Sequence, residues 1–337
     1  MARTYIIAEA GVNHNGSLEL AFRLVDEAKA AGADCVKFQT FKAERIVTAS
    51  SPKANYQLEV TDRAESQFDM LRKLELDREA FARIQDRCRK VGIDFMSTPY
   101  NPEDAELLNG LGVDAFKIAS GQVVELPFLR QVARYGRRMI VSTGMADMQE
   151  VREAVDVIRS TGNNDLFVLQ CNTDYPSRVE DVNLRAMLTM RDELRVRAGY
   201  SDHVPDNYAC YAAVALGAEM IEKHFTLDNA MPGPDHSSSL EPSAFRELVK
   251  GIRAVELSLG DGIKRPSERE RANTYGMRRS LVAARELPAD HVLSGADLGF
   301  KRPANGLSPK HLDTVVGRRL ARPLRLDEAL TWDHLHP

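Results

Sequence analysis

Short apolar segments alternate with longer amphipathic segments from residue 4 to about residue 226. The short segments have the length of buried strands, and the longer ones repeat apolar residues at the spacing of one helix face. The predicted strands are Tyr5–Ala10, Cys35–Thr40, Asp94–Thr98, Ala115–Ser120, Met139–Thr143, Leu166–Cys171, Ala198–Asp202 and Met220–Phe225. The predicted helices between them are Leu18–Ala31, Arg78–Val91, Pro102–Gly110, Leu126–Tyr135, Met148–Ser160, Leu184–Glu193 and Asn207–Leu216. Eight strands that alternate with helices predict an α/β fold with a parallel sheet closed into a (β/α)8 TIM barrel.

An open, doubly wound sheet is the alternative arrangement for such an alternation. The turn after the first strand argues against it, because residues 9–16 read EAGVNHNG and lack the G-x-G-x-x-G phosphate turn. Several predicted helices end at a glycine directly before the next strand, as at Gly32, Gly92 and Gly217. Glycine is a common helix stop, so these positions support the predicted boundaries.

Two connections are longer than a barrel needs. Residues 41–77 contain Lys42, Lys53 and Tyr56 and a predicted helix near Ser66–Leu74, and residues 226–242 are rich in proline and glycine. Loops of this length on the active face of a barrel usually cover a ligand. After a further predicted helix, residues 260–276 are polar and predict a linker. The chain therefore divides into a barrel domain, 1–276, and a small β-rich domain, 277–337.

The composition is that of an ordinary globular protein, with 43% hydrophobic and 28% charged residues. A net charge of -4 argues against general binding of nucleic acid. The four cysteines lie far apart without a C-x-x-C pair, which argues against a disulfide framework or a zinc cluster. No apolar run has the length of a membrane span, and the chain enters a predicted strand without room for a signal peptide. We therefore expect a cytoplasmic protein.

Two lysines occupy predicted strands between apolar neighbours, Lys37 in the second strand and Lys117 in the fourth. Catalytic groups of a barrel lie at the carboxyl ends of its strands, where both lysines would enter the same mouth. A buried lysine is costly unless an anion pairs with it. The pair predicts a bound phosphate or carboxylate. The alternative is that each lysine pairs with a structural carboxylate such as Glu9 or Glu222.

Two histidines end the last two strands, His203 after the seventh and His224 in the eighth. Imidazoles at the ends of neighbouring strands can hold one divalent metal ion and leave positions open for water or substrate. The alternative is two unrelated core histidines, since two ligands make a sparse site. Other strand ends are also polar: Glu9 ends the first strand, Thr98 the third, and residues 172–176 follow the sixth.

Several separated motifs, taken together, resemble the sialic acid synthase family. They are residues 7–16 (IAEAGVNHNG), 36–40 (VKFQT), 97–99 (STP), 116–121 (FKIASG), 199–203 (GYSDH), 222–226 (EKHFT) and 232–235 (PGPD). The tail resembles the C-terminal antifreeze-like SAF domain of that family through residues 278–282 (RRSLV) and 301–303 (KRP). The resemblance covers nearly the whole chain.

This resemblance implies a synthase that condenses phosphoenolpyruvate with an N-acylated mannose-type sugar and releases phosphate. It implies that His203 and His224 ligate Mn²⁺ or Mg²⁺, with Glu9 nearby, and that Tyr175 and Asp235 face the sugar. The implied phosphoenolpyruvate and substrate contacts are Lys37, Thr98, Lys117, Ser120, Thr173 and Ser201. Arg302 would reach the acyl group of a sugar bound in the partner subunit of a domain-swapped homodimer. Gln122, which we include among the catalytic positions, stands where the family commonly has glutamate, and glutamine cannot shuttle a proton.

The sequence therefore predicts an N-acetylneuraminate synthase that uses N-acetylmannosamine. A legionaminic acid synthase that uses 2,4-diacetamido-2,4,6-trideoxymannose is the alternative, because residues 172–175 read NTDY. A metal-dependent pyruvate aldolase is a more distant alternative, and it would not need two buried lysines aimed at a phosphate. A carbohydrate-binding or ice-binding protein built around the tail is disfavoured, because a scaffold has no reason to bury so many polar groups.

Overall fold

The computed structural model describes residues 3–53, 57–58, 61–62 and 64–337, so the predicted position of Tyr56 lies outside the described residues. The chain forms two compact units, Met1–Gly260 and Asp261–Pro337. No helix in the described part of the chain is both long enough and apolar enough to cross a membrane. Each unit is described separately below.

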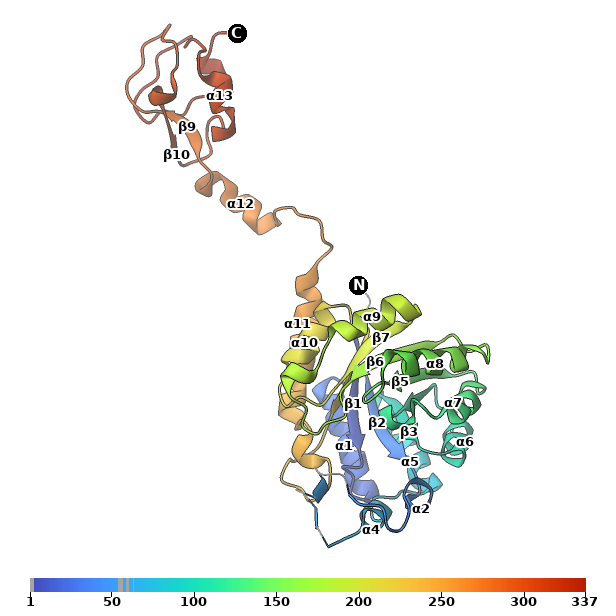
Figure 1. Ribbon diagram of the computed structural model, residues 1–337. Helices are drawn as coiled ribbons and strands as arrows, with labels where there is room; N and C mark the ends of the chain where they lie inside the picture. The colour runs from blue at the N-terminus through green and yellow to red at the C-terminus, as the bar shows by residue number, and fades with distance from the viewer. Residues whose placement is uncertain (1–2, 54–56, 59–60, 63) are drawn as a thin grey trace. The chain divides into compact units, whose positions relative to one another are not determined.

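The first unit is the predicted TIM barrel (Figure 1). Its strands are β1 (Tyr5–Gly11), β2 (Cys35–Thr40), β3 (Asp94–Pro99), β4 (Ala115–Ile118), β5 (Arg138–Ser142), β6 (Leu166–Cys171), β7 (Arg197–Asp202) and β8 (Met220–His224). They form one sheet of parallel strands in the order β3-β2-β1-β8-β7-β6-β5-β4. Contacts between β3 and β4 bring the two ends of the sheet together. The closed barrel confirms the predicted fold and excludes the open doubly wound sheet.

Helices surround the barrel. They are α1 (Leu18–Ala31), α5 (Arg78–Val91), α6 (Pro102–Gly110), α7 (Leu126–Ala133), α8 (Met148–Arg159), α9 (Arg185–Leu194), α10 (Tyr208–Ala215) and α11 (Pro242–Leu259). Local sequence explains their ends: Ser17 caps α1 by accepting a hydrogen bond from the amide of Leu20, and Gly32 ends it with a left-handed φ of 90°. The main core lies between these helices and the outward-facing residues of the strands.

A second apolar layer fills the inside of the barrel: Ile7, Cys35, Met96, Ala115, Ile140, Phe167, Leu169 and Met220. Strand side chains alternate between the two faces, so the residue two positions further along also points into the barrel. That rule leads from Ile7 to Glu9, from Cys35 to Lys37 and from Met220 to Glu222. The barrel is therefore apolar at its lower level and polar where its strands end.

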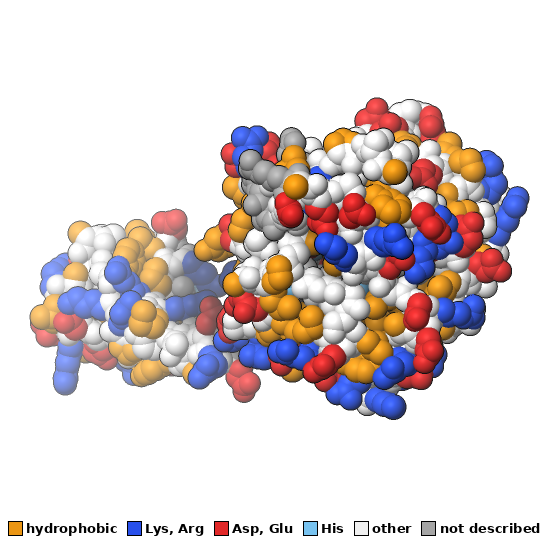
Figure 2. All heavy atoms as spheres, turned by 90° about the horizontal axis from the view of Figure 1, so that it is seen from below, with side chains coloured by type: hydrophobic (Ala, Val, Ile, Leu, Met, Phe, Trp, Pro, Cys, Tyr) orange, Lys and Arg blue, Asp and Glu red, His pale blue; other side chains and the backbone are white. Residues whose placement is uncertain are grey.

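The long connection after β2 includes, in its described part, the short helices α2 (Ala43–Ile46) and α4 (Gln67–Arg72). It packs over the barrel mouth through a small apolar cluster of Val12, Phe41 and Leu74 with Ile46, Leu71 and Tyr100. Figure 2 views the barrel unit from the side that carries α4, and lysine and arginine side chains are interspersed there with acidic ones. The described side chains of this face therefore form no continuous basic surface of the kind that binds nucleic acid.

The second unit begins with a helix that the sequence analysis did not predict. Within the predicted linker, α12 (Glu268–Met277) starts at Ser267, which forms a capping box with Glu270. The unit continues with an antiparallel pair, β9 (Ser280–Ala283) and β10 (Leu298–Lys301), and the short helix α13 (Leu312–Val315). Its own small core consists largely of leucines. This small antiparallel sheet agrees with the β-rich character that the sequence predicts for the tail.

Candidate active site

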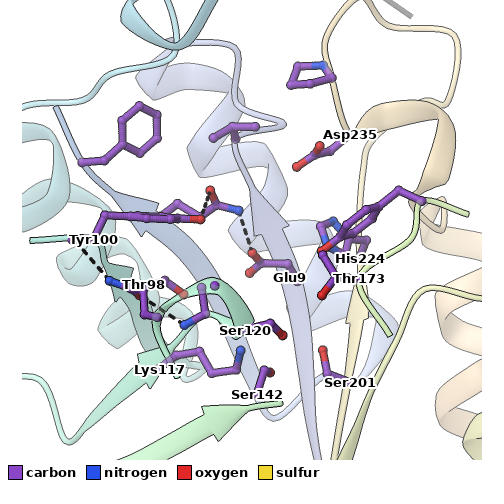
Figure 3. A pocket seen from close by; sticks show the side chains of 18 of the residues that line it. Glu9, Thr98, Tyr100, Lys117, Ser120, Ser142, Thr173, Ser201, His224 and Asp235 are labelled. Carbon is purple, nitrogen blue, oxygen red and sulfur yellow. Dashed lines mark hydrogen bonds between the residues drawn. The ribbon is translucent and has the colours of Figure 1, made fainter. Parts of the chain in front are cut away.

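A pocket of about 470 Å³ opens at the carboxyl ends of the barrel strands (Figure 3). Twelve of the thirteen predicted site residues line it: Glu9, Lys37, Thr98, Lys117, Ser120, Gln122, Thr173, Tyr175, Ser201, His203, His224 and Asp235. Arg302 belongs to the second compact unit. The closed barrel therefore brings together residues as far apart in the chain as Glu9 and Asp235.

Two lysines and two glutamates form a buried charge cluster on the pocket floor. The Nζ of Lys37 lies 3.1 Å from Oε2 of Glu9 and 3.4 Å from Oε1 of Glu222. The Nζ of Lys117 lies 3.3 Å from the same Glu222 oxygen. The carboxylate partners that were considered as the alternative to a bound anion are thus present. Since the four formal charges cancel, pairing alone does not decide whether an anion also binds.

The two glutamates differ in their affinity for protons. Burial raises the pKa of Glu9 to about 7, although the nearby Lys37 ammonium opposes that shift. Burial acts on Glu222 in the same direction, but the ammonium groups of Lys117 and Lys37 outweigh it and lower its pKa to about 2. Glu222 therefore stays a carboxylate at neutral pH, whereas Glu9 can hold or release a proton. Such a divided pair is what acid–base chemistry requires.

Hydroxyl groups gather beside Lys117 at the ends of four strands: Ser120, Ser142, Thr173 and Ser201. Ser142 was not among the predicted site residues, although it ends the fifth strand. Its Oγ is buried and has no hydrogen-bond partner among the described residues, and neither has Oε2 of Glu222. Gly144 keeps this corner open, because a Cβ there would come within 2.1 Å of the Thr173 hydroxyl oxygen. Unsatisfied buried polar atoms around a cavity indicate a place for a polar ligand.

The two histidines lie side by side across β7 and β8, with ring centroids 5.2 Å apart. Nδ1 of His203 lies 2.5 Å from the carbonyl oxygen of Asn172, and it must donate because a carbonyl only accepts. In the neutral form of this ring, Nε2 therefore carries the free electron pair that a metal ion would bind. Nδ1 of His224 is buried without a hydrogen-bond partner among the described residues, and burial keeps its pKa well below the ordinary value.

These features fit a divalent metal ion held by the two imidazoles. The carbonyl contact that fixes the tautomer of His203 is the usual support for a metal-binding histidine. Within residues 3–53, 57–58, 61–62 and 64–337, no cluster of three or more histidine, cysteine, aspartate or glutamate side chains has metal-binding geometry. A metal bound here would therefore take its other ligands from water and substrate, which leaves it open for chemistry.

Asp235 reaches the pocket from the loop after β8. Burial raises its pKa to about 6. The turn after β1 supports this loop: Asn13 donates from Nδ2 to Oγ of Ser239, which in turn donates to the carbonyl of Asp235, and Asn15 donates to the carbonyl of Pro232. Tyr175 lies on the other side, with its ring centroid 4.1 Å from that of His203. Asn13 and Asn15 of the first motif thus hold the loop after β8 in place.

Comparison with known proteins shows the family of this chain. The model of the NeuB family matches residues 24–264, and the model of the SAF domain matches residues 278–336. The chain belongs to the NeuB family. It is 43% identical to N,N'-diacetyllegionaminic acid synthase of Campylobacter jejuni over 98% of this chain and 99% of the relative, and 42% identical to the Legionella pneumophila protein of the same name over 98% and 94%. Among solved structures it resembles the N-acetylneuraminic acid (sialic acid) synthetase of Leptospira borgpetersenii, with 32% identity, a TM-score of 0.72, and coverage of 81% of this chain and 90% of that one.

Besides Ser142, Gln39 and Tyr100 line this NeuB-family pocket without having been among the predicted site residues. Gln39 donates from Nε2 to Oε1 of Glu9 at 3.1 Å and accepts from the Tyr100 hydroxyl at 3.1 Å (Figure 3). The chain Tyr100–Gln39–Glu9 therefore fixes the orientation of the Glu9 carboxyl group. The parity of the second strand places Gln39 on the inner face, but no sequence signal connects it with Tyr100.

Gln122 lines the pocket, and its amide group is held by backbone. Its Nε2 donates to the carbonyl of Tyr100 at 3.1 Å, and its Oε1 accepts from the amide of Ala119 at 3.3 Å. The segment predicted as the end of the fourth strand here turns into a 3₁₀ helix, Ser120–Gln122. The glutamine thus links the turn after β4 to the turn after β3. A glutamate would lack the amide donor that faces the Tyr100 carbonyl.

Arg302 lies in the SAF domain, beyond the end of β10. Its Nε donates to the carbonyl of Met277 at 3.0 Å, and the residue is exposed. The described residues give the Arg302 side chain no other hydrogen bond or ion pair, so its remaining guanidinium nitrogens are available for a ligand outside the domain. The sequence prediction of a role in the sugar site stays a prediction.

Proposed function

We propose that this NeuB-family protein is a nonulosonic acid synthase. It condenses phosphoenolpyruvate with an N-acylated mannose-type sugar and water, and it yields a nine-carbon 2-keto acid and inorganic phosphate. The observation that carries the proposal is one pocket with two halves. Buried lysines lie among hydroxyl groups on one side, where Oγ of Ser142 has no partner among the described residues, and two neighbouring histidines lie on the other side. The names of its relatives as acid synthases support the same class.

The lysine half suits phosphoenolpyruvate. Lys117 supplies positive charge, and Ser120, Ser142 and Ser201 supply hydroxyl donors at the ends of three different strands. Donors that come from rigid strands are preorganised for an anion and strengthen as charge develops on the departing phosphate. Lys37 is more firmly bound, since it contacts Glu9, Glu222 and the Thr98 hydroxyl at 3.2 Å. We therefore assign Lys117 to phosphate contact and Lys37 to the support of the carboxylates.

The histidine half suits the sugar aldehyde. A divalent metal held by His203 and His224 would polarise the carbonyl oxygen of the aldehyde. The third carbon of phosphoenolpyruvate then forms the new bond to the aldehyde carbon, and the aldehyde oxygen needs a proton. Glu9 lies in register with His224 on the adjacent strand, and its pKa of about 7 allows it to deliver that proton. Water adds at the second carbon, and phosphate leaves.

We favour the deoxygenated, diacylated sugar of the legionaminic acid series over N-acetylmannosamine, which reverses the order of the two sequence hypotheses. Five apolar side chains line the pocket on the side of the long connection: Val12, Phe41, Ile46, Val47 and Leu71. A sugar with a methyl group at its sixth carbon and two acetamido groups offers more apolar surface to such a wall. The identities of 43% and 42% to the two diacetyllegionaminic acid synthases exceed the 32% identity to the N-acetylneuraminic acid synthetase of Leptospira borgpetersenii, which supports the same choice.

We further propose that Arg302 completes the site in the partner subunit of a homodimer, by donating to an acyl oxygen of the sugar. Support comes from its exposed guanidinium group and from its place in a SAF domain that follows a NeuB-family barrel.

Phosphate release from phosphoenolpyruvate tests the function. With Mn²⁺ present, we expect release to depend on the sugar, with kcat/KM at least tenfold higher for 2,4-diacetamido-2,4,6-trideoxymannose than for N-acetylmannosamine. Pyruvate in place of phosphoenolpyruvate serves as the control and should give no condensation product. Turnover with pyruvate would instead identify an aldolase. Sugar-independent phosphate release, or none with either sugar, would contradict the proposal.

A further inference from the structure

A second buried charge pair lies behind the two histidines, on the outer face of the sheet. Lys223 precedes His224 in β8 and points the opposite way, toward α10, because strand side chains alternate. Its Nζ lies 2.5 Å from Oδ2 of Asp202 at the end of β7. Lys223 is 3% exposed and Asp202 is 0% exposed. Neither side chain lines the pocket, so the chemistry proposed above makes no use of them.

The Lys223 ammonium also holds the segment that follows His203. It donates to the carbonyl of Val204, and it donates to the carbonyl of Asp206 at 2.8 Å. These contacts satisfy all three donors of the ammonium group. Two of its three acceptors are thus backbone atoms of one loop. Lys223 fastens that loop to β8 directly beside His224.

Asp202 holds the same loop from the other end. Its Oδ1 accepts from the amide of Val204 at 2.9 Å and from the Tyr200 hydroxyl at 2.7 Å, while Oδ2 also accepts from Sγ of Cys210 at 3.1 Å. The flanking residues of His203 are therefore both tied into this cluster. Because the carboxylate and the ammonium are fully satisfied, the cluster admits a single arrangement.

We propose that Lys223 and Asp202 are positioning residues that set the spacing and orientation of the two imidazoles, and thereby the affinity of the site for a divalent metal. The inference rests on the metal use within the proposed function. A buried ion pair is a poor way to stabilise a sheet, because well-packed apolar residues do so at least as well. The contacts here instead converge on the backbone between His203 and residue 206, where a shift of the loop would move one imidazole relative to the other.

Binding of Mn²⁺ to the full-length protein without substrates tests this, measured by electron paramagnetic resonance. We expect Asp202→Asn and Lys223→Met each to weaken Mn²⁺ binding at least tenfold, at a temperature where circular dichroism shows the folded barrel. Asp34→Asn is the matched control. Asp34 accepts from the amide of Ile6 and pairs with Arg253 at 3.0 Å, before the second strand, so its loss costs stability without touching either histidine.

Two results separate this inference from the function on which it rests. If the wild-type protein binds no Mn²⁺, so that its electron paramagnetic resonance signal equals that of His203→Ala, the proposed use of a metal ion is itself wrong. Wild-type protein that binds Mn²⁺ while both cluster variants bind it within twofold would overturn the positioning role alone. If Lys223→Met does not fold, Lys223→Arg is used instead, because the larger cation keeps the charge but displaces the loop carbonyls. Its Mn²⁺ binding should also be at least tenfold weaker than that of the wild type.

Discussion

The atoms around the two buried lysines indicate whether the lysines bind a ligand or only balance the nearby glutamates. Lys37 and Lys117 are already neutralised by Glu9 and Glu222, so charge balance by itself is satisfied without a ligand. Hydrogen bonding is not satisfied, because Oγ of Ser142, Oε2 of Glu222 and Nδ1 of His224 lack partners among the described residues. Three unsatisfied buried groups around one cavity would cost several kcal/mol if nothing bound there, at about 1–3 kcal/mol each. A polar ligand therefore explains the pocket better than a structural ion network does.

Lys117 provides the test at the scale of one residue. Replacing it with methionine keeps the volume and removes the ammonium group that faces the hydroxyl cluster. Loss of a charge-assisted contact should raise the KM for phosphoenolpyruvate on the order of 10- to 100-fold, from about 1.5–3 kcal/mol, with a smaller change in the KM for the sugar. Steady-state kinetics with each substrate varied in turn measures the difference.

Lys42→Met is the matched control for that experiment. Lys42 pairs with Glu75 at 2.8 Å and does not line the pocket. Its loss should leave both KM values within about twofold, as is usual for a partly exposed pair. Equal KM values for phosphoenolpyruvate in Lys117→Met and wild type would show that Lys117 only balances Glu222.

At the scale of the elements, strand parity explains why so much of the site was predictable. Six of the eight described strands carry an apolar residue inside the barrel and a polar one two positions later, so much of the inner face can be predicted from the sequence. Contacts across loops follow no such rule. The link from Gln39 to Tyr100, the backbone contacts of Gln122 and the support of the Asp235 loop by Asn13 join segments whose pairing depends on the closed barrel. Helix α12 was missed because its polar, charged sequence lacks an apolar face.

The long connection after β2 supplies the test at this scale. Val47 lines the pocket from this connection, and threonine has nearly the same shape but carries a hydroxyl group. Val47→Thr should lower kcat/KM for 2,4-diacetamido-2,4,6-trideoxymannose by roughly 3- to 10-fold, because a polar group replaces part of an apolar wall. The value for N-acetylmannosamine should change less than about twofold. Competition between the two sugars, followed by product mass, gives the ratio directly.

Val124→Thr makes the same chemical change outside the pocket, at a side chain that is 55% exposed. Its selectivity should equal that of the wild type. If Val47→Thr also leaves the ratio unchanged, the apolar wall does not contact the part of the sugar in which the two substrates differ.

At the scale of the whole molecule, the unit that carries Arg302 has only a small core. Its core is a single cluster of mostly leucine side chains around one pair of strands. Arg302 lies exposed beside Met277 and Phe300, which are 59% and 43% exposed. A cation flanked by exposed apolar side chains is typical of a surface that docks against another protein surface. A second copy of the chain would provide that surface in a closed two-fold dimer.

Mixing two inactive variants tests the exchange of Arg302 between subunits. Arg302→Ala retains an intact barrel site, and His224→Ala retains an intact SAF domain. If Arg302 acts in the partner, each mixed dimer contains one site with both residues, so activity should return to about half that of an equal amount of wild-type dimer. Mixing His203→Ala with His224→Ala is the control and should stay inactive, because each pocket then keeps one defect. Mixed dimers of Arg302→Ala and His224→Ala that are verified by mass and remain as inactive as their parents would place Arg302 in the site of its own chain.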